Sequence, residues 1–369
     1  MNRLFRWDQM GLFLLALAAG ILPFAVPEVC AAALREGLTL CSGPLLLSLF
    51  PFLVVSRLLI QCPESDLLAL PFRLAAWGIG IRTPCAARVL CIGFLGGFAP
   101  AASAAAQAVR TGQLTAEEAD ALLPACICSG PSFVVLTVGQ SLLGSAELGV
   151  LLFASQITAN YLTAALLNRF AGVRSVKPGS AAPASPAPPR LDEILADAAI
   201  TYCKLCGFIL FFRMLAAGAG ALLPAGAGTL CSILLEACSG CDLASRTGRW
   251  GSLLCCAALS VQGLSVLLQV RTICPPEMTL RPLYRARMLH LPLSLALFYL
   301  LLPGGEADVF STLPARVFLM RRVPPDCALL VFAVCCMAAC TLRSGIRQVE
   351  QKQMARNAGG CCINSKTLL

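Results

Sequence analysis

Four charged side chains lie within otherwise apolar stretches of this 369-residue chain: Arg57, Lys204, Arg213 and Glu236. A charge inside an apolar helix is costly, so such residues usually have a purpose. The planar guanidinium of Arg57 and Arg213 matches a carboxylate, so the pair could hold an anion. As ordinary helix-end arginines they would instead reach the lipid headgroups. Glu236 could couple a proton or a cation, contact a polar substrate, or cap a neighbouring helix.

Small and amide side chains flank two breaks in apolar segments, one at Pro131 and one at Gln262. A break inside a membrane frees backbone N–H and C=O groups, which lipid cannot satisfy. The flanking side chains either serve only those groups or also line a substrate site, and we favour the second interpretation. With Ser239 beside Glu236, these candidates are Ser129, Gly130, Ser132, Ser239, Gln262, Gly263, Ser265 and Gln269.

Motifs for catalysis or cofactor binding are missing from the sequence. It has no phosphate-binding loop, dinucleotide fingerprint, serine-hydrolase elbow or zinc-protease helix, and His290 is its only histidine. The 21 cysteines lie mostly in apolar runs, where they act as small hydrophobic residues. Two Cys-x-x-Cys pairs, at Cys203/Cys206 and Cys238/Cys241, leave a metal or redox site as the lesser alternative. We expect no catalytic residue, no metal and no cofactor, and therefore no enzyme.

The composition excludes an ordinary soluble protein. Hydrophobic residues make up 58% of the chain and charged residues 13%, and the mean hydropathy is +0.79, whereas soluble domains carry about 25% charged residues. The formal net charge of +9 comes from basic residues in loops and the tail, which is typical of membrane proteins. We therefore expect the lipid bilayer, and no nucleic acid, as a partner.

The apolar stretches divide the chain into ordered parts. We expect an N-terminal transmembrane segment (1–36), two related halves (37–170 and 191–303) joined by a Pro/Ala-rich linker (171–190), a C-terminal transmembrane segment (304–342) and a basic polar tail (343–369). About seven or eight full crossings and at least two half-crossings are expected. One polar segment, Thr115–Leu123, predicts a capped surface helix with Glu118 at the capping-box position.

The two halves resemble each other in the order of their segments. Residues 52–59 align with 208–215, which places Arg57 opposite Arg213, and 129–136 align with 262–269. Paired broken helices in two halves are typical of secondary transporters, whose site lies where the repeats meet. The pattern predicts an all-α polytopic membrane protein with an inverted repeat.

Six segments, taken in order, resemble a known family. They are Leu47–Phe52, Gly96–Gly112, Glu117–Ala119, Ser129–Phe133, Leu235–Gly240 and Gln262–Val270. They are similar to the YlbJ-type sporulation integral membrane proteins, which carry the nucleoside-recognition (Gate) domain. The chain departs from that pattern at Ile127 and Cys128, where the family tends to have asparagines. The resemblance implies an endospore-forming bacterium and transport of dipicolinic acid across the outer forespore membrane.

The function expected from these observations is passage of a small anionic solute across a membrane, with dipicolinic acid favoured by the resemblance. A coupling proton or cation would accompany it. The alternatives are a nucleoside-type solute transporter, a non-transporting membrane scaffold needed for the spore cortex or envelope, and a membrane enzyme acting on an envelope precursor.

Overall fold

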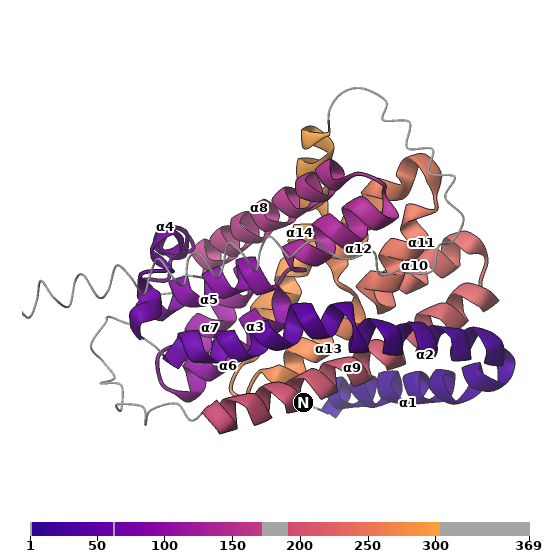
Figure 1. Cartoon of the computed structure of the whole chain (residues 1–369), viewed down its shortest axis with the longest axis horizontal. Helices are drawn as coiled ribbons and strands as arrows, with labels where there is room; N and C mark the ends of the chain where they lie inside the picture. The colour runs from indigo at the N-terminus through magenta and orange to yellow at the C-terminus, as the bar shows by residue number, and fades with distance from the viewer. Residues whose placement is uncertain (1, 62, 172–190, 303–369) are drawn as a thin grey trace, which may run out of the picture.

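The computed structural model describes residues 2–61, 63–171 and 191–302, and in these ranges all regular structure is helical. Figure 1 shows the helices packed around one another, with α9 running beside α2 and α3. The predicted all-α class is therefore confirmed. The elements are α1 (Asn2–Ala25), α2 (Pro27–Ser42), α3 (Pro44–Gln61), η1 (Pro63–Asp66), α4 (Leu70–Gly78), α5 (Pro84–Gly96), α6 (Phe98–Arg110), α7 (Ala116–Cys126), η2 (Ser132–Leu142), α8 (Ala146–Ala171), α9 (Leu191–Leu222), α10 (Ala225–Leu235), α11 (Ala237–Ser245), η3 (Gly248–Trp250), α12 (Gly251–Val261), α13 (Gly263–Ile273) and α14 (Arg281–Leu301).

Three helical stretches of the described residues are long and apolar enough to cross a membrane: Ala146–Ala171, Leu191–Leu222 and Gly248–Ile273. A fourth arises if α1 and α2, bent by 110°, form one broken span. The seven or eight crossings expected refer to the whole chain, whereas in the described residues several other apolar helices are only 10–17 residues long. The linker and the segment 304–342 lie outside the described residues.

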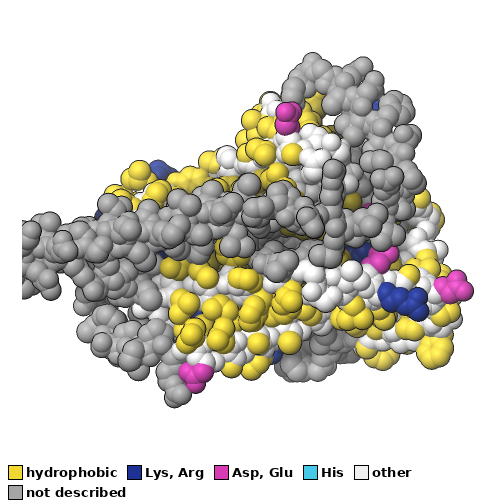
Figure 2. Space-filling model, in the orientation of Figure 1, with side chains coloured by type: hydrophobic (Ala, Val, Ile, Leu, Met, Phe, Trp, Pro, Cys, Tyr) yellow, Lys and Arg dark blue, Asp and Glu magenta, His cyan; other side chains and the backbone are white. Residues whose placement is uncertain are grey.

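Apolar side chains are spread over the surface. Figure 2 shows them on the visible face with few charged groups between them. Large residues exposed there and elsewhere include Phe13, Phe24, Leu74, Phe170 and Leu300. Such exposed apolar side chains, together with the apolar spans, are compatible with a multi-pass helical membrane protein.

The capping box of α7 is present as expected. Thr115 Oγ1 accepts a hydrogen bond from the Glu118 backbone N at 3.1 Å, and Glu118 Oε2 accepts one from the Thr115 backbone N at 3.2 Å. The surface location was wrong, however, because Glu118 and Asp120 are buried. Their charges are satisfied internally: Thr83 donates to Glu118 at 2.6 Å, and the Thr279 backbone N donates to Asp120 at 2.8 Å.

The predicted helix breaks at 129–131 and at 262–263 are confirmed. After α7, an irregular stretch precedes the π-helical segment η2, and Gln262 separates α12 from α13 with φ +60°. The helix α10 ends at Leu235, and Glu236 begins the next helix, α11, and caps it. A further break at Gly97 separates α5 from α6.

Candidate functional site

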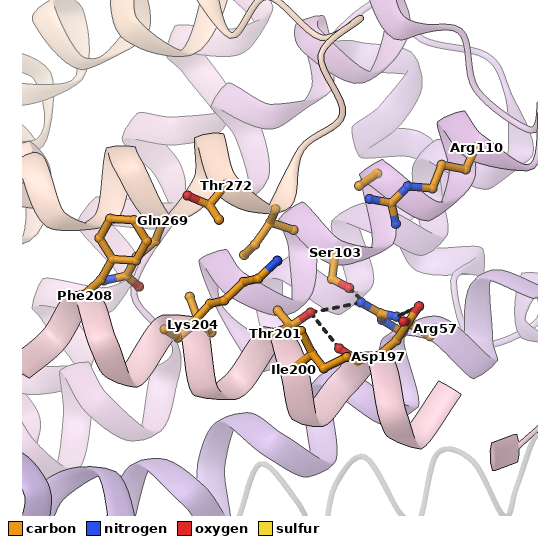
Figure 3. Close-up of a pocket in the computed structure, with 13 residues that line it drawn as sticks. Arg57, Ser103, Arg110, Asp197, Ile200, Thr201, Lys204, Phe208, Gln269 and Thr272 are labelled. Carbon is orange, nitrogen blue, oxygen red and sulfur yellow. Dashed lines mark hydrogen bonds and ion pairs between the residues drawn. The ribbon is translucent and has the colours of Figure 1, made fainter. Parts of the chain in front are cut away.

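A polar pocket of about 140 Å³ lies between helices of the two halves, with walls from α3, α6, α9 and α13 (Figure 3). The surface that lines it is more polar than apolar. The residues that line it are Arg57, Ser103, Ala106, Arg110, Asp197, Ile200, Thr201, Lys204, Leu205, Phe208, Gln269, Thr272 and Ile273.

Arg57 is the buried centre of this pocket. Its guanidinium donates to Ser103 Oγ of α6 at 3.2 Å, to Asp197 Oδ2 of α9 at 2.6 Å and to Thr201 Oγ1 of α9 at 3.1 Å. The arginine side chain is 8% exposed, and that of Asp197 is 61% exposed. A buried charge needs such partners, because an unpaired one costs far more than a hydrogen bond returns. Arg57 thus joins α3, α6 and α9 at one point.

Positive charge exceeds negative charge in the pocket. Lys204 of α9 and Arg110 of α6 reach toward the same space as Arg57 (Figure 3). Asp197 is the only carboxylate among the lining residues, so three cationic groups face one acid. A confined site lined by one sign of charge concentrates ions of the other sign. The geometry suits a small anion.

Gln269 brings α13 into the pocket wall. Its Nε2 donates to Ser265 Oγ at 2.9 Å, one turn earlier on the same helix. Its Oε1 is buried and has no donor among the residues that the structure describes. A buried acceptor without a donor lowers the stability of the folded state.

Arg213 and Glu236 lie in a different place. Arg213 donates to Glu36 of α2 at 2.7 Å and approaches Cys238 Sγ at 3.9 Å. Glu236 caps α11: its two oxygens accept from the backbone N atoms of Cys238 and Ser239, each at 2.7 Å. Ser239 Oγ also donates to it at 2.8 Å. Arg213 therefore does not line the pocket around Arg57, although the two arginines align in the sequence.

The remaining predicted residues lie at two helix crossings, which are the places where the backbones of two broken helices contact each other. At the first crossing, a Cβ on Gly97 would lie 2.7 Å from the backbone N of Gly130. At the second, a Cβ on Gly263 would lie 2.8 Å from the backbone N of Glu236. Gln262 links the crossings, because its Nε2 donates to the Ile127 carbonyl at 3.4 Å.

Of the predicted site residues, the pocket thus contains Arg57 and Gln269, and Ser265 supports Gln269. Gly130, Gln262, Gly263 and Glu236 form the crossings, and Ser129 and Ser132 are half-buried beside the first of them.

Sequence reasoning missed Asp197, Thr201 and Arg110 as pocket residues. A signal was present for α9, because Asp197, Thr201 and Lys204 are spaced to share one helical face. This signal is easily overlooked, because α9 begins with Asp192 and Glu193 and acidic residues are common in the first turn of any helix.

In the described part of the chain, no three His, Cys, Asp or Glu side chains come together to hold a metal ion. The 14 cysteines described there are all free thiols, ten of them buried. No protein-family model, no curated protein and no solved structure matches the chain.

Proposed function

We propose that this chain is a multi-pass membrane transporter for a small anionic solute, which it binds in the pocket around Arg57. The observation that carries the proposal is the excess of cationic side chains in a polar pocket between helices of the two halves. A charged pocket inside an apolar protein costs stability, and a solute that needs those charges is its simplest explanation.

The pocket restricts the solute by size and chemistry. Its volume of about 140 Å³ is well below the roughly 300–1,000 Å³ of drug-sized sites. Guanidinium groups bind planar carboxylates well, and hydroxyl groups from Ser103, Thr201 and Thr272 add neutral hydrogen-bonding partners. A compact dicarboxylate fits this description. Dipicolinate, the solute that the family resemblance implies, is therefore the first to test, with the outer forespore membrane as the expected location.

The two helix crossings supply the moving parts of the proposed mechanism. Each half contributes one pair of broken helices whose backbones touch, at Gly97–Gly130 and at Glu236–Gly263. We interpret the pairs as the units of an inverted repeat, in which one unit moves against the other around a fixed site. The pocket, built from α3 and α6 on one side and α9 and α13 on the other, would then open alternately to either face.

Thermal unfolding of the purified chain in detergent tests the proposal directly. Dipicolinate should raise the melting temperature, since a ligand at about a hundred times its Kd stabilises by about 2.7 kcal/mol. Arg57→Gln and Lys204→Gln should each remove most of that rise and abolish uptake into liposomes. Arg246→Gln is the matched control. Arg246 is a half-exposed arginine that pairs with Asp242 and does not line the pocket.

The remaining outcomes separate the alternatives. If Arg213→Gln weakens binding as much as Arg57→Gln, both arginines hold the solute, and the pocket alone is not the site. Stabilisation by nucleosides and not by dipicolinate would support the nucleoside transporter instead. If no small anion or nucleoside shifts the melting temperature, transport by this pocket is wrong and a scaffold role is favoured.

A further inference from the structure

Arg287 is a second buried arginine, on α14, that the proposed transport pocket does not use. Only 8% of its surface is exposed. The helix α14 packs against α7, α8 and α12, which brings Arg287 to the place where two broken helices end. Its Nη2 donates to the carbonyl of Ile127, the C-cap residue that follows α7. Its Nη1 donates at 3.4 Å to the carbonyl of Ser260, in the last turn of α12.

No carboxylate of the described residues lies within 4 Å of this guanidinium. Its Nε has no hydrogen-bond partner there either. Asn160 and Gln262 also donate to the Ile127 carbonyl, at 3.3 and 3.4 Å, but Arg287 makes the shortest of the three bonds. Arg287 is therefore a buried cation whose partners are backbone carbonyl oxygens.

Helix dipoles explain how this charge is tolerated. The C-terminal end of a helix carries a partial charge of about −0.5, because its last carbonyl groups have no intrahelical partners. Two such ends, of α7 and α12, together offset about one positive charge. In transporters with broken helices, half-helix C-terminal ends and unwound carbonyls are also the groups that coordinate a coupling cation.

We propose that the junction of α7 and α12 is a monovalent-cation site that the chain fills with its own guanidinium, that of Arg287. The tethered charge neutralises both helix ends permanently, so this junction takes up and releases no cation. Shortening Arg287 to alanine empties the site and lets a free monovalent cation bind to the carbonyls of Ile127 and Ser260.

One consequence rests on the proposed function. If the chain transports an anion, uptake by the wild type should be unchanged when Na⁺ is replaced by choline. Uptake by Arg287→Ala should instead depend on Na⁺ or K⁺. The site itself does not rest on transport, so it can be tested without any solute.

The test is thermal unfolding of the purified full chain and its variants in detergent, in chloride salts of Na⁺, K⁺, guanidinium or choline at equal low millimolar concentration. Arg287→Lys should melt close to the wild type, because it keeps the charge, and Arg287→Met should melt several degrees lower. The melting temperature of Arg287→Ala should also be lower than that of the wild type in choline chloride. At least half of that decrease should be recovered in the Na⁺, K⁺ or guanidinium salt. The wild type should not respond. The control Arg271→Ala, which removes an exposed arginine bonded to a single carbonyl, that of Met278, should not respond either.

The proposal would be overturned by neutral variants as stable as the wild type, by a lysine variant as unstable as the methionine variant, or by an alanine variant whose melting temperature is the same in all the salts. If Arg287→Ala yields folded protein only when purified with one of these cations, the proposal is supported, and if it yields none in any salt, the proposal fails. Absence of uptake of any solute would reject the proposed function and leave the thermal result standing.

Discussion

Asp197 lowers the positive charge of the pocket, and it forms an ion pair with Arg57. Arg57 is buried and its guanidinium is held by three acceptors, whereas Asp197 is largely exposed. The arginine keeps its bonds to Ser103 and Thr201 without the aspartate. Asp197 therefore contributes to stability only modestly, as exposed carboxylates do, but it opposes the field that attracts an anion.

Replacing Asp197 with asparagine should consequently tighten anion binding. The change raises the excess of positive charge in the pocket by one unit, and a charge a few ångströms away is worth about 1 to 4 kcal/mol between bulk water and a protein surface. We expect Kd for a dicarboxylate to fall about tenfold, which corresponds to about 1.4 kcal/mol, and the effect to shrink in high salt. Calorimetric titration in detergent measures it.

Glu193→Gln is the matched control for that measurement, since it removes an exposed carboxylate of the same helix that does not line the pocket. Weaker or unchanged binding by Asp197→Asn would mean that the anion does not sit beside Arg57.

Single residues were predictable where their type contrasts with their surroundings. Arg57 and Gln269 stand out in apolar stretches, and both line the pocket. Arg287 does not stand out, because it follows Arg281 and Arg285 and resembles a loop residue by sequence. Only the packing of α14 shows that it is buried against two helix ends.

Helix breaks were predictable from Gly and Pro, but their partners were not. The sequence indicates breaks near Pro131 and Gln262, and the structure confirms both. It does not indicate that Gly97 touches Gly130, because that contact joins breaks more than thirty residues apart through backbone atoms alone. The start of α11 was not predicted, because its cap is a glutamate, which is a less common cap than Ser, Thr, Asp or Asn.

Gly97→Ala should disrupt the first crossing. Gly97 has φ +82° and ψ −165°, a conformation essentially restricted to glycine, and a Cβ there would also meet Gly130. We expect the free energy of unfolding to fall by at least about 3 kcal/mol, because backbone strain of about 1–3 kcal/mol adds to the cost of the steric contact. The melting temperature and the yield of monodisperse protein check this.

Gly112→Ala separates the two causes of that loss. Gly112 also has a positive φ, of +68°, but a Cβ there meets nothing within 4 Å. Its cost should be only that of the left-handed conformation, about 1–2 kcal/mol. Equal melting temperatures for the two variants would show that the backbones of Gly97 and Gly130 are not in contact.

The two halves form one packed body in the described part of the chain. The largest hydrophobic cluster takes Ile92 and Leu122 from the first half and Val270 and Leu283 from the second. The helix α9, which opens the second half, packs on α2 and α3. The sequence predicts two halves but does not predict this shared core, because apolar helix faces do not indicate which partner they meet.

Neither half should therefore fold alone. We expect fragments 1–171 and 191–369 to be recovered together from membranes when they are co-expressed with an affinity tag on only one of them. Each fragment expressed singly should be degraded or aggregated, because its half of the shared core would be exposed. A stable, monodisperse first fragment would show that the halves are independent domains.

The helix α6 has a core of alanines that are almost completely buried: Ala99, Ala101, Ala102, Ala104, Ala105, Ala106 and Ala108. Alanine gives up no side-chain conformational entropy on folding, whereas burying a leucine or isoleucine costs about 0.5–1 kcal/mol. This layer of the protein is consequently ordered at a small entropic cost. It also has no alternative rotamers, so the wall that carries Ser103 and Arg110 cannot reshape itself side chain by side chain. A change in the packing of this alanine face therefore requires α6 to move as a rigid body.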